Sequence, residues 1–438
     1  MYLIFLFINA KIIISCSESV KPDFGFALLL FCKKRYTEKG EEMSKTKLWT
    51  KDFFIIIIIN FLVFLNHLMI LATFPFFISY LGYSDTVSGI CVAVFSLIAV
   101  VFRPIVGWML DSGKRKIILL IGLCGMGMMP LGYLLVYTLI SSIVLAIICR
   151  LAHGIALAFS NTSTSTIASD IIPKERFSEG MGMFGMATAL ATSCAPAIGE
   201  MLMNIGFNYL FIVSTITMII SLVLFAFLKT PKLKLEKKKF SIKGLVEKNS
   251  LPASATALIF LLTYGTLENY TLKFASTQES ITLSGGLFFA IMAIMLLVTR
   301  ITIGKVADKK GEAIFVYSCN ILMLIAFLLL AFIPNNITFI LSAILSGYAF
   351  GGIEPSLQAM AVNIASPERR GAANSTFLCA YDIGIGVGGG IAGVLIDIVG
   401  YNHMFMLISI ANIVSILIYY IFGRNHPSSM TYILKHNM

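Results

Sequence analysis

Twelve apolar segments occupy most of the sequence beyond residue 52, and each is longer than 20 residues. An α-helix rises about 1.5 Å per residue, so about 20 apolar residues cross the roughly 30 Å of hydrocarbon in a bilayer. Open strands leave backbone groups unpaired in lipid, and the ten-residue alternation of a membrane barrel is absent. The sequence therefore predicts an all-α integral membrane protein with twelve transmembrane helices. The segments are 53–80, 86–110, 117–138, 141–168, 179–203, 207–228, 251–272, 281–304, 313–334, 337–365, 372–396 and 402–423.

Composition supports a membrane protein. Of the 438 residues only 13% are charged, and the mean hydropathy is +0.90. Soluble domains carry about 25% charged residues. The net charge of +11 could suggest a nucleic-acid partner, but Lys and Arg gather in the loops on one side of the predicted membrane. This placement argues for the lipid bilayer as the partner and against nucleic acid.

One motif occurs twice, with Arg, Gly and Asp at intervals of four residues and hence on one face of a helix. The two copies stand 197 residues apart, at the ends of the second and eighth apolar segments. A repeat at half-chain spacing predicts two parallel six-helix bundles. The copies are Arg103, Gly107 and Asp111, and Arg300, Gly304 and Asp308.

Positive charge predicts the orientation of the helices. If both termini are cytoplasmic, 20 Lys and Arg residues fall in the inner loops, linker and tail, whereas only Lys273 falls in an outer connection. Cytoplasmic loops of membrane proteins carry this excess. We therefore expect a multi-pass protein of the plasma membrane, of bacterial origin, with both termini in the cytoplasm.

The chain divides into five regions. Residues 1–42 contain apolar stretches too short to span a bilayer, and 39–42 back-translate to a purine-rich stretch like a bacterial ribosome-binding site. We interpret 1–42 as a mis-assigned upstream extension, with Met43 as the natural start. The other predicted regions are an N-terminal half (43–228), a basic cytoplasmic linker (229–250), a C-terminal half (251–423) and a cytoplasmic tail (424–438).

Two parallel six-helix halves joined by a long basic loop resemble the major facilitator superfamily, and the resemblance covers 50–424. The loop signature of that family is similar to Gly107-x-x-x-Asp111-x-x-x-Arg115-Lys116, although Lys114 stands where the family has a second Gly. The resemblance also implies that Asp111 is linked to an acidic residue opening the eleventh helix, where Asp382 is suitably placed.

Two further signatures lie in the fourth and fifth predicted helices. The family's Arg-x-x-Gln-Gly resembles Arg150-Leu-Ala-His153-Gly154, with His in place of Gln. The signature of the drug–proton antiporter branch is matched in degraded form by Ala191-x-x-x-Ala195-Pro-x-x-Gly-Glu. The resemblance implies a secondary transporter similar to the twelve-helix members of that branch.

The motif residues at the helix ends are interpreted as a gate that stabilises one conformation. Arg103 and Arg300 lie about two turns from the cytoplasmic ends of their helices, within snorkelling reach. The predicted gating set is Arg103, Gly107, Asp111, Arg115, Lys116, Arg300, Gly304, Asp308 and Asp382.

Five other ionisable residues are candidates for binding substrate or protons, because a charge at the bilayer centre costs about 2.5–3.5 kcal/mol. Arg150 lies near the predicted midplane, with His67 at a similar depth and His153 one helical turn away. Either His could instead serve as a helix–helix hydrogen bonder. Glu354, followed by a proline that interrupts the backbone ladder, is the first acidic candidate, and Glu268 is the second.

The sequence predicts a transporter rather than an enzyme. It contains no phosphate loop, no His-Glu-x-x-His and no nucleophile elbow, so no cofactor and no metal are predicted. We expect a monomer that exports small organic or drug-like molecules by alternating access, driven by protons. The alternatives are an importer or uniporter of a small metabolite on the same fold, and a polytopic membrane enzyme acting on lipid.

Overall fold

The computed structural model describes residues 47–111, 114–173, 176–230, 246–363, 370–429 and 431–433. Within these ranges the side chains of Asp111, 177–179, 300–310, 363 and 370–372 also lie outside the description. The predicted upstream extension and most of the predicted linker therefore fall beyond the described residues.

Six membrane-length helices form the N-terminal half: α3 (Lys51–Tyr80), α4 (Asp85–Asp111), α5 (Arg115–Leu135), α6 (Ile143–Ile171), α7 (Phe177–Ile205) and α8 (Phe207–Phe227). A π-helical turn, η1 (Val136–Ile140), extends α5. Hydroxyl caps begin two of these helices. The Oγ1 of Thr50 accepts the amide of Phe53 at 3.2 Å, and the Oγ of Ser142 accepts that of Leu145 at 3.4 Å. Such caps satisfy amides that have no partner inside the helix.

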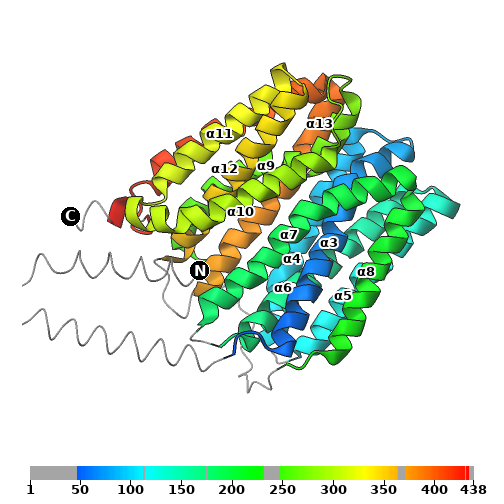
Figure 1. Cartoon of the computed structure of the whole chain (residues 1–438), viewed down its shortest axis with the longest axis horizontal. Coiled ribbons are helices and arrows are strands. Elements are labelled where there is room, and N and C mark those ends of the chain that lie inside the picture. Colours follow the sequence, from blue (N-terminus) through cyan, green and yellow to red (C-terminus); the bar gives the residue numbers. More distant parts are fainter. Residues whose placement is uncertain are drawn as a thin grey trace, which may run out of the picture.

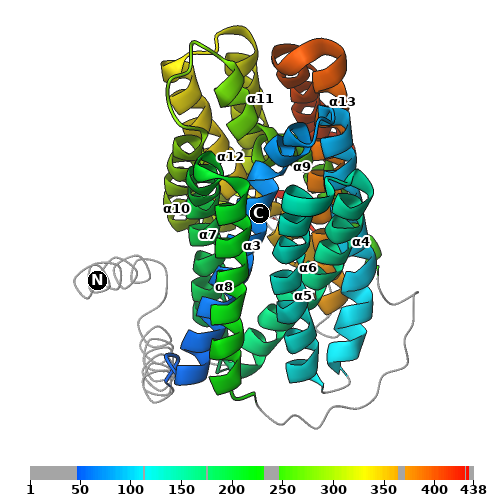
Figure 2. The ribbon, with the colours of Figure 1, turned by 90° about the vertical axis from the view of Figure 1, so that its right-hand side faces the viewer.

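The C-terminal half contains α9 (Leu251–Thr277), α10 (Gly285–Lys310), α11 (Ala313–Phe332), α12 (Asn336–Asn363) and α13 (Arg370–Ile418), with short turns η4 (Lys248–Ser250) and η5 (Tyr419–Gly423). The 49 residues of α13 are two successive helices, because Gly400 breaks the run with φ 78°. Counting α13 as two, the described residues form twelve long helices, the number that the sequence predicts. They are arranged in two bundles (Figures 1 and 2).

The repeat is visible at this break. Gly206 separates α7 from α8 in the first half, and Gly400 occupies the matching place in the second. Both have a positive φ, of 156° and 78°. A φ of 78° strains any residue with a Cβ, so a glycine is needed where the second-half chain reverses.

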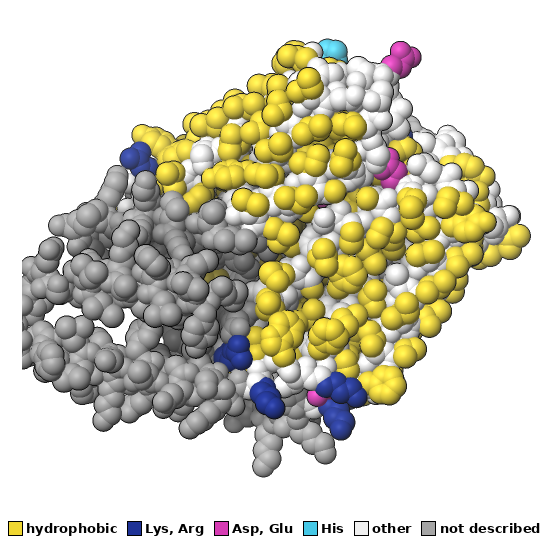
Figure 3. Space-filling view, viewed as in Figure 1, with side chains coloured by type: hydrophobic (Ala, Val, Ile, Leu, Met, Phe, Trp, Pro, Cys, Tyr) yellow, Lys and Arg dark blue, Asp and Glu magenta, His cyan; other side chains and the backbone are white. Residues whose placement is uncertain are grey.

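Each bundle has its own buried core, and the outside is apolar. The largest cluster of buried side chains lies mostly within α9–α13 and reaches Ala72 of α3 and Ala189 of α7, whereas three others lie within the N-terminal half. Figure 3 shows a band of hydrophobic side chains over one face, with Lys and Arg along the lower edge. Ile148, Ile219 and Ile294 are exposed on such surfaces. Large exposed aliphatic side chains are stable there because they face lipid rather than water.

The two halves meet along three pairs of helices. α4 packs against α13, α7 against α10, and α3 against α9. Side chains on α3, α4 and α7 can therefore approach the C-terminal half.

Candidate functional site

Three of the predicted candidates lie together inside the N-terminal half. Arg150 and His153 are one turn apart on α6, and both are fully buried. The ring of His67 on α3 lies 6.4 Å from that of His153, centroid to centroid. We call these three residues the cationic cluster. Their shared depth could be read from the sequence, and the structure brings them into one place.

Aromatic rings that the sequence did not single out surround the cationic cluster. The guanidinium carbon of Arg150 lies 4.4 Å from the ring centroid of Phe74 on α3 and 4.1 Å from that of Phe95 on α4. Phe95 also stacks on His67 with centroids 5.1 Å apart. Tyr133 on α5 places its hydroxyl 3.3 Å from Nδ1 of His153. Contacts between a cation and aromatic faces contribute roughly 0.5–2 kcal/mol each.

Most side-chain nitrogens of the cationic cluster have no hydrogen bond to the described residues. Among the described residues, none of the three guanidinium nitrogens of Arg150 has a hydrogen bond that meets the distance and angle limits, although the Tyr133 hydroxyl lies close enough to interact with the guanidinium. Nδ1 of His67 and Nε2 of His153 are likewise buried without a hydrogen bond. No described Asp or Glu lies within ion-pair distance of Arg150. A buried guanidinium in this state is unusual, because desolvation is normally offset by a counter-ion.

Arg103 contrasts with Arg150, because it has a carboxylate partner from the other half. Its Nε lies 2.6 Å from Oδ2 of Asp382 on α13, and its Nη2 donates to Oδ1 at 3.0 Å. The sequence predicted that both residues belong to the gate but did not predict that they pair. The resemblance instead implied a link between Asp382 and Asp111, whose side chain lies outside the description.

The two acidic candidates lie at different depths in the C-terminal half. Glu268 on α9 is 7% exposed, forms no hydrogen bond with the described residues, and interacts electrostatically with Asp382. Glu354 is half-buried on α12. Helices α6 and α12 begin at the same end of the molecule, and Glu354 lies about 16 Å further from that end than Arg150 does. The helix continues through Pro355, so the backbone there is not irregular as the proline suggested.

The remaining gating residues are only partly described. Arg115 forms an ion pair with Asp170 on α6, and Lys116 lies 5.5 Å above the ring of Phe225 on α8. A Cβ added to Gly107 would meet nothing within 4 Å. The side chains of the second motif copy, Arg300, Gly304 and Asp308, lie outside the description.

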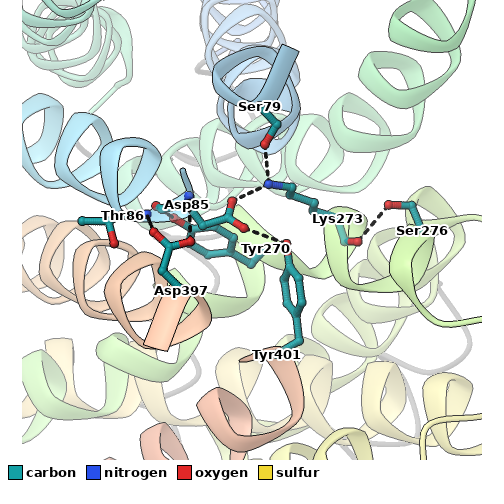
Figure 4. Close-up of polar contacts among 8 residues, drawn as sticks. All are labelled: Ser79, Asp85, Thr86, Tyr270, Lys273, Ser276, Asp397 and Tyr401. Atoms are coloured by element: carbon teal, nitrogen blue, oxygen red, sulfur yellow. Dashed lines mark hydrogen bonds and ion pairs between the residues drawn. The ribbon is translucent and has the colours of Figure 1, made fainter. Parts of the chain in front are cut away.

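A second polar site, which sequence reasoning missed, joins the halves at the end opposite the basic loops (Figure 4). Asp85, the first residue of α4, forms an ion pair with Lys273 on α9 and accepts the hydroxyl of Tyr401 at 3.2 Å. Asp397 on α13 accepts the amides of Asp85 and Thr86 at 3.1 and 2.7 Å. We call these five residues the Asp85 cluster. Its one sequence signal is that it contains Lys273, the single basic residue predicted for the outer connections.

A matching contact lies where α7 meets α10. Oε2 of Glu200 accepts the hydroxyl of Ser284 and the amide of Gly286, both at 2.7 Å, and Oε1 accepts the amide of Gly285 at 3.2 Å. The N-termini of α4 and α10 are thus each capped by a carboxylate from the opposite half. Anionic caps are favourable there because a helix N-terminus has unpaired amides and a partial positive charge.

Comparison with known proteins places the chain in a family. The sequence profile of the Major Facilitator Superfamily matches residues 56–333 and 286–432. The chain belongs to the Major Facilitator Superfamily. This confirms the resemblance drawn from the paired motifs.

Two curated relatives of the chain are a bacterial export protein and a bacterial resistance protein. The chain is 24% identical over 353 residues to the staphylopine export protein of Staphylococcus aureus, covering 75% of this chain and 85% of that protein. It is 24% identical over 389 residues to multidrug resistance protein 2 of Bacillus subtilis, covering 83% and 94%. The solved structure of a POT family transporter superposes with a TM-score of 0.70 at 15% identity, covering 86% and 96%.

The family and fold establish a membrane-embedded transporter of small molecules similar to efflux proteins. This membership agrees with the prediction of a transporter over that of a membrane enzyme. The substrate, the direction of transport and the energy source are matters for proposal.

Proposed function

We propose that this protein exports small organic molecules across a bacterial plasma membrane by alternating access, driven by protons. The observation that carries the proposal is the set of polar contacts between the halves at one end of the molecule. The Asp85 cluster and the Glu200 cap close that end. In the orientation predicted by the basic loops, it is the outer end, and this conformation would open inward.

Alternating access requires these contacts to break and re-form as one half rocks against the other. Every bond described at the outer end is a hydrogen bond or ion pair at a helix terminus, and the cap bonds join a carboxylate to backbone amides. Such contacts contribute about 0.5–2 kcal/mol each, so several together can hold one state without preventing the other.

Proton coupling is supported by the position of Glu268. Glu268 is buried on α9 and interacts electrostatically with Asp382, which is paired with Arg103 of the other half. When the halves move, Arg103 can separate from Asp382. The charge near Glu268 then changes, and with it the proton affinity of Glu268. Glu354 remains the alternative proton site. Export is favoured over import because both curated relatives described above have names that indicate efflux or drug resistance.

Transport by proteoliposomes tests the coupling. A gradient of one pH unit supports about tenfold accumulation per proton. We expect the parent protein to accumulate substrate against its gradient only when a pH gradient is present. Glu268→Gln should exchange substrate but not accumulate it, whereas exposed Glu279→Gln serves as the matched control. Equal accumulation with and without the gradient would refute proton coupling, and a loss confined to Glu354→Gln would move the proton site to α12.

A disulfide across the closed end tests alternating access. Thr86→Cys with Asp397→Cys joins positions already in contact between the halves. We expect oxidation to stop transport and reduction to restore it, while Thr86→Cys alone responds to neither treatment. Undiminished transport by the cross-linked protein would show that this end does not need to open.

A further inference from the structure

The cationic cluster has no carboxylate partner among the residues that the structure describes. Arg150 is permanently charged, fully buried and without a counter-ion among the described residues. Two more nitrogens, from His67 and His153, lie nearby without a hydrogen bond. Phe74 and Phe95 offer only their faces. An arginine that served packing alone would be replaced without loss by an apolar residue of similar volume.

The missing partner has a definite chemistry. A guanidinium whose nitrogens have no carboxylate partner among the described residues matches a carboxylate or a similar planar anion, because two parallel hydrogen bonds can form. The flanking rings favour an apolar or aromatic body attached to that anionic group. Asp382 of the opposite half is already paired with Arg103 and forms no ion pair with Arg150.

The helix that carries Phe95 links this cluster to the movement of the halves. Phe95 lies on α4 between Asp85 and Arg103, and both of these residues contact the C-terminal half. Arg150 and His67 lie on α6 and α3. Both described ion pairs between the halves involve α4. When the C-terminal half moves, we therefore expect α4 to move with it and to carry the Phe95 ring.

We propose that Arg150, His67 and His153 bind the anionic group of the transported molecule, and that Phe95 covers this site in the present conformation. The substrates are then small organic acids or zwitterions with an apolar body. This inference rests on the proposed export function and narrows its substrate class. While Phe95 covers the site, substrate cannot bind, so the apparent affinity is lowered by the fraction of molecules in which the site is uncovered.

Matched pairs of acids and amides test the proposal. The probes are benzoate, 2-naphthoate and indole-3-acetate, each compared with its neutral amide by equilibrium binding to the full chain in detergent at one pH. Removing one partner of a buried charged contact costs about 2 kcal/mol or more, or roughly 30-fold in affinity. We expect at least one acid to bind about tenfold or more tightly than its amide, and Arg150→Gln to abolish that preference.

Two further variants keep the outcome interpretable. Arg424→Gln removes another arginine that lies over a ring, Tyr420 at 5.6 Å, and should leave the preference for acids unchanged. Arg150→Met fills the same space with an apolar chain and should also abolish the preference, which covers the case in which Arg150→Gln does not fold. No preference for any acid in the parent, or an unchanged preference in Arg150→Met, would overturn the proposal.

The assay separates this inference from the proposed function. Binding is measured without a pH gradient or a membrane, so a failure of proton coupling leaves its result unaffected. Conversely, loss of the anion preference would leave gradient-driven export standing and would remove only the substrate class.

Discussion

Arg103 and Arg150 are the same residue type in neighbouring membrane helices of one half, and their surroundings are opposite. Arg103 binds Asp382 of the other half through two nitrogens, whereas Arg150 has no hydrogen bond and no carboxylate. Arg103 therefore joins the two halves of the protein in this conformation. Arg150 is a buried charge inside one half, with no ion-pair partner among the described residues. Charge inside a membrane thus has two distinct uses in this chain.

The acidic side chains deepest within the described helices lie in the C-terminal half. The described charged or imidazole side chains that lie about two turns or more from either helix end differ between the halves. They are cationic or imidazole in the N-terminal half (His67, Arg103, Arg150 and His153) and carboxylic in the C-terminal half (Glu268, Glu354 and Asp382). The Arg103–Asp382 pair is where the two sets meet. Opposite charges on two moving halves attract each other, and a bound proton or substrate that neutralises one of them weakens the attraction.

The largest effect is expected from breaking the Arg103–Asp382 pair. Removing one partner of a buried ion pair costs about 3–5 kcal/mol, and the partial exposure here, 16% and 15%, lowers this to roughly 2–3 kcal/mol. Arg103→Met should therefore lower the free energy of unfolding and abolish transport. Denaturant unfolding in detergent measures the first and proteoliposome uptake the second. Reversing the pair, with Arg103→Asp and Asp382→Arg together, should recover part of the stability, and an unchanged Arg103→Met stability would show the pair to be dispensable.

Arg150→Met should affect the free energy of unfolding differently from Arg103→Met. Replacing an uncompensated buried charge by an apolar chain removes a desolvation cost, so the free energy of unfolding should stay the same or rise by about 1–2 kcal/mol. Transport of an acidic substrate should nevertheless be lost. The same unfolding assay provides the check, with Arg103→Met as its counterpart. A stability loss as large as that of Arg103→Met would mean that Arg150 is structural.

Much of this fold could be predicted from the sequence because its determinants are local or periodic. Membrane spans follow from apolar length, and the two bundles follow from the repeat that places Gly206 and Gly400 at matching turns. Arg150, His67 and His153 could be grouped because depth in a membrane is readable from position along a helix. Most of the candidate site was therefore within reach of sequence reasoning.

The contacts between the halves could not be predicted in the same way. Asp397 and Asp85 are 312 residues apart, and neither belongs to the repeated motif. Which helix faces of the two halves meet depends on packing across the interface, which no local pattern encodes. The aromatic neighbours of Arg150 were missed for a related reason. Phe74 and Phe95 are two among 34 phenylalanines, and only the geometry distinguishes them.

A smaller effect is expected from the cap that Asp397 provides to α4. Loss of a helix cap costs about 1 kcal/mol, which corresponds to roughly a fivefold shift between two conformations. Asp397→Asn should therefore favour the state open at this end without unfolding the protein. Labelling of a cysteine placed at Ser88, which is fully buried on α4 near this end, reports the opening. The exposed residue Glu279 gives the control variant Glu279→Gln, and equal labelling rates in both variants would argue against a role for the cap.

The smallest effect on stability is expected at Gly107, and it separates folding from cycling. A Cβ at Gly107 meets nothing within 4 Å, whereas a Cβ at Gly89 on the same helix would lie 2.7 Å from the carbonyl oxygen of Gly390. Gly107→Ala should therefore change the free energy of unfolding by less than about 0.5 kcal/mol, and Gly89→Ala should destabilise by about 1–3 kcal/mol through overpacking. If Gly107 belongs to a gate, Gly107→Leu should insert and melt like the parent and bind substrate normally, yet transport more slowly. A variant that transports at the parental rate would leave the motif around Gly107 without a gating role, and one that loses substrate affinity while cycling normally would place the motif in the binding site.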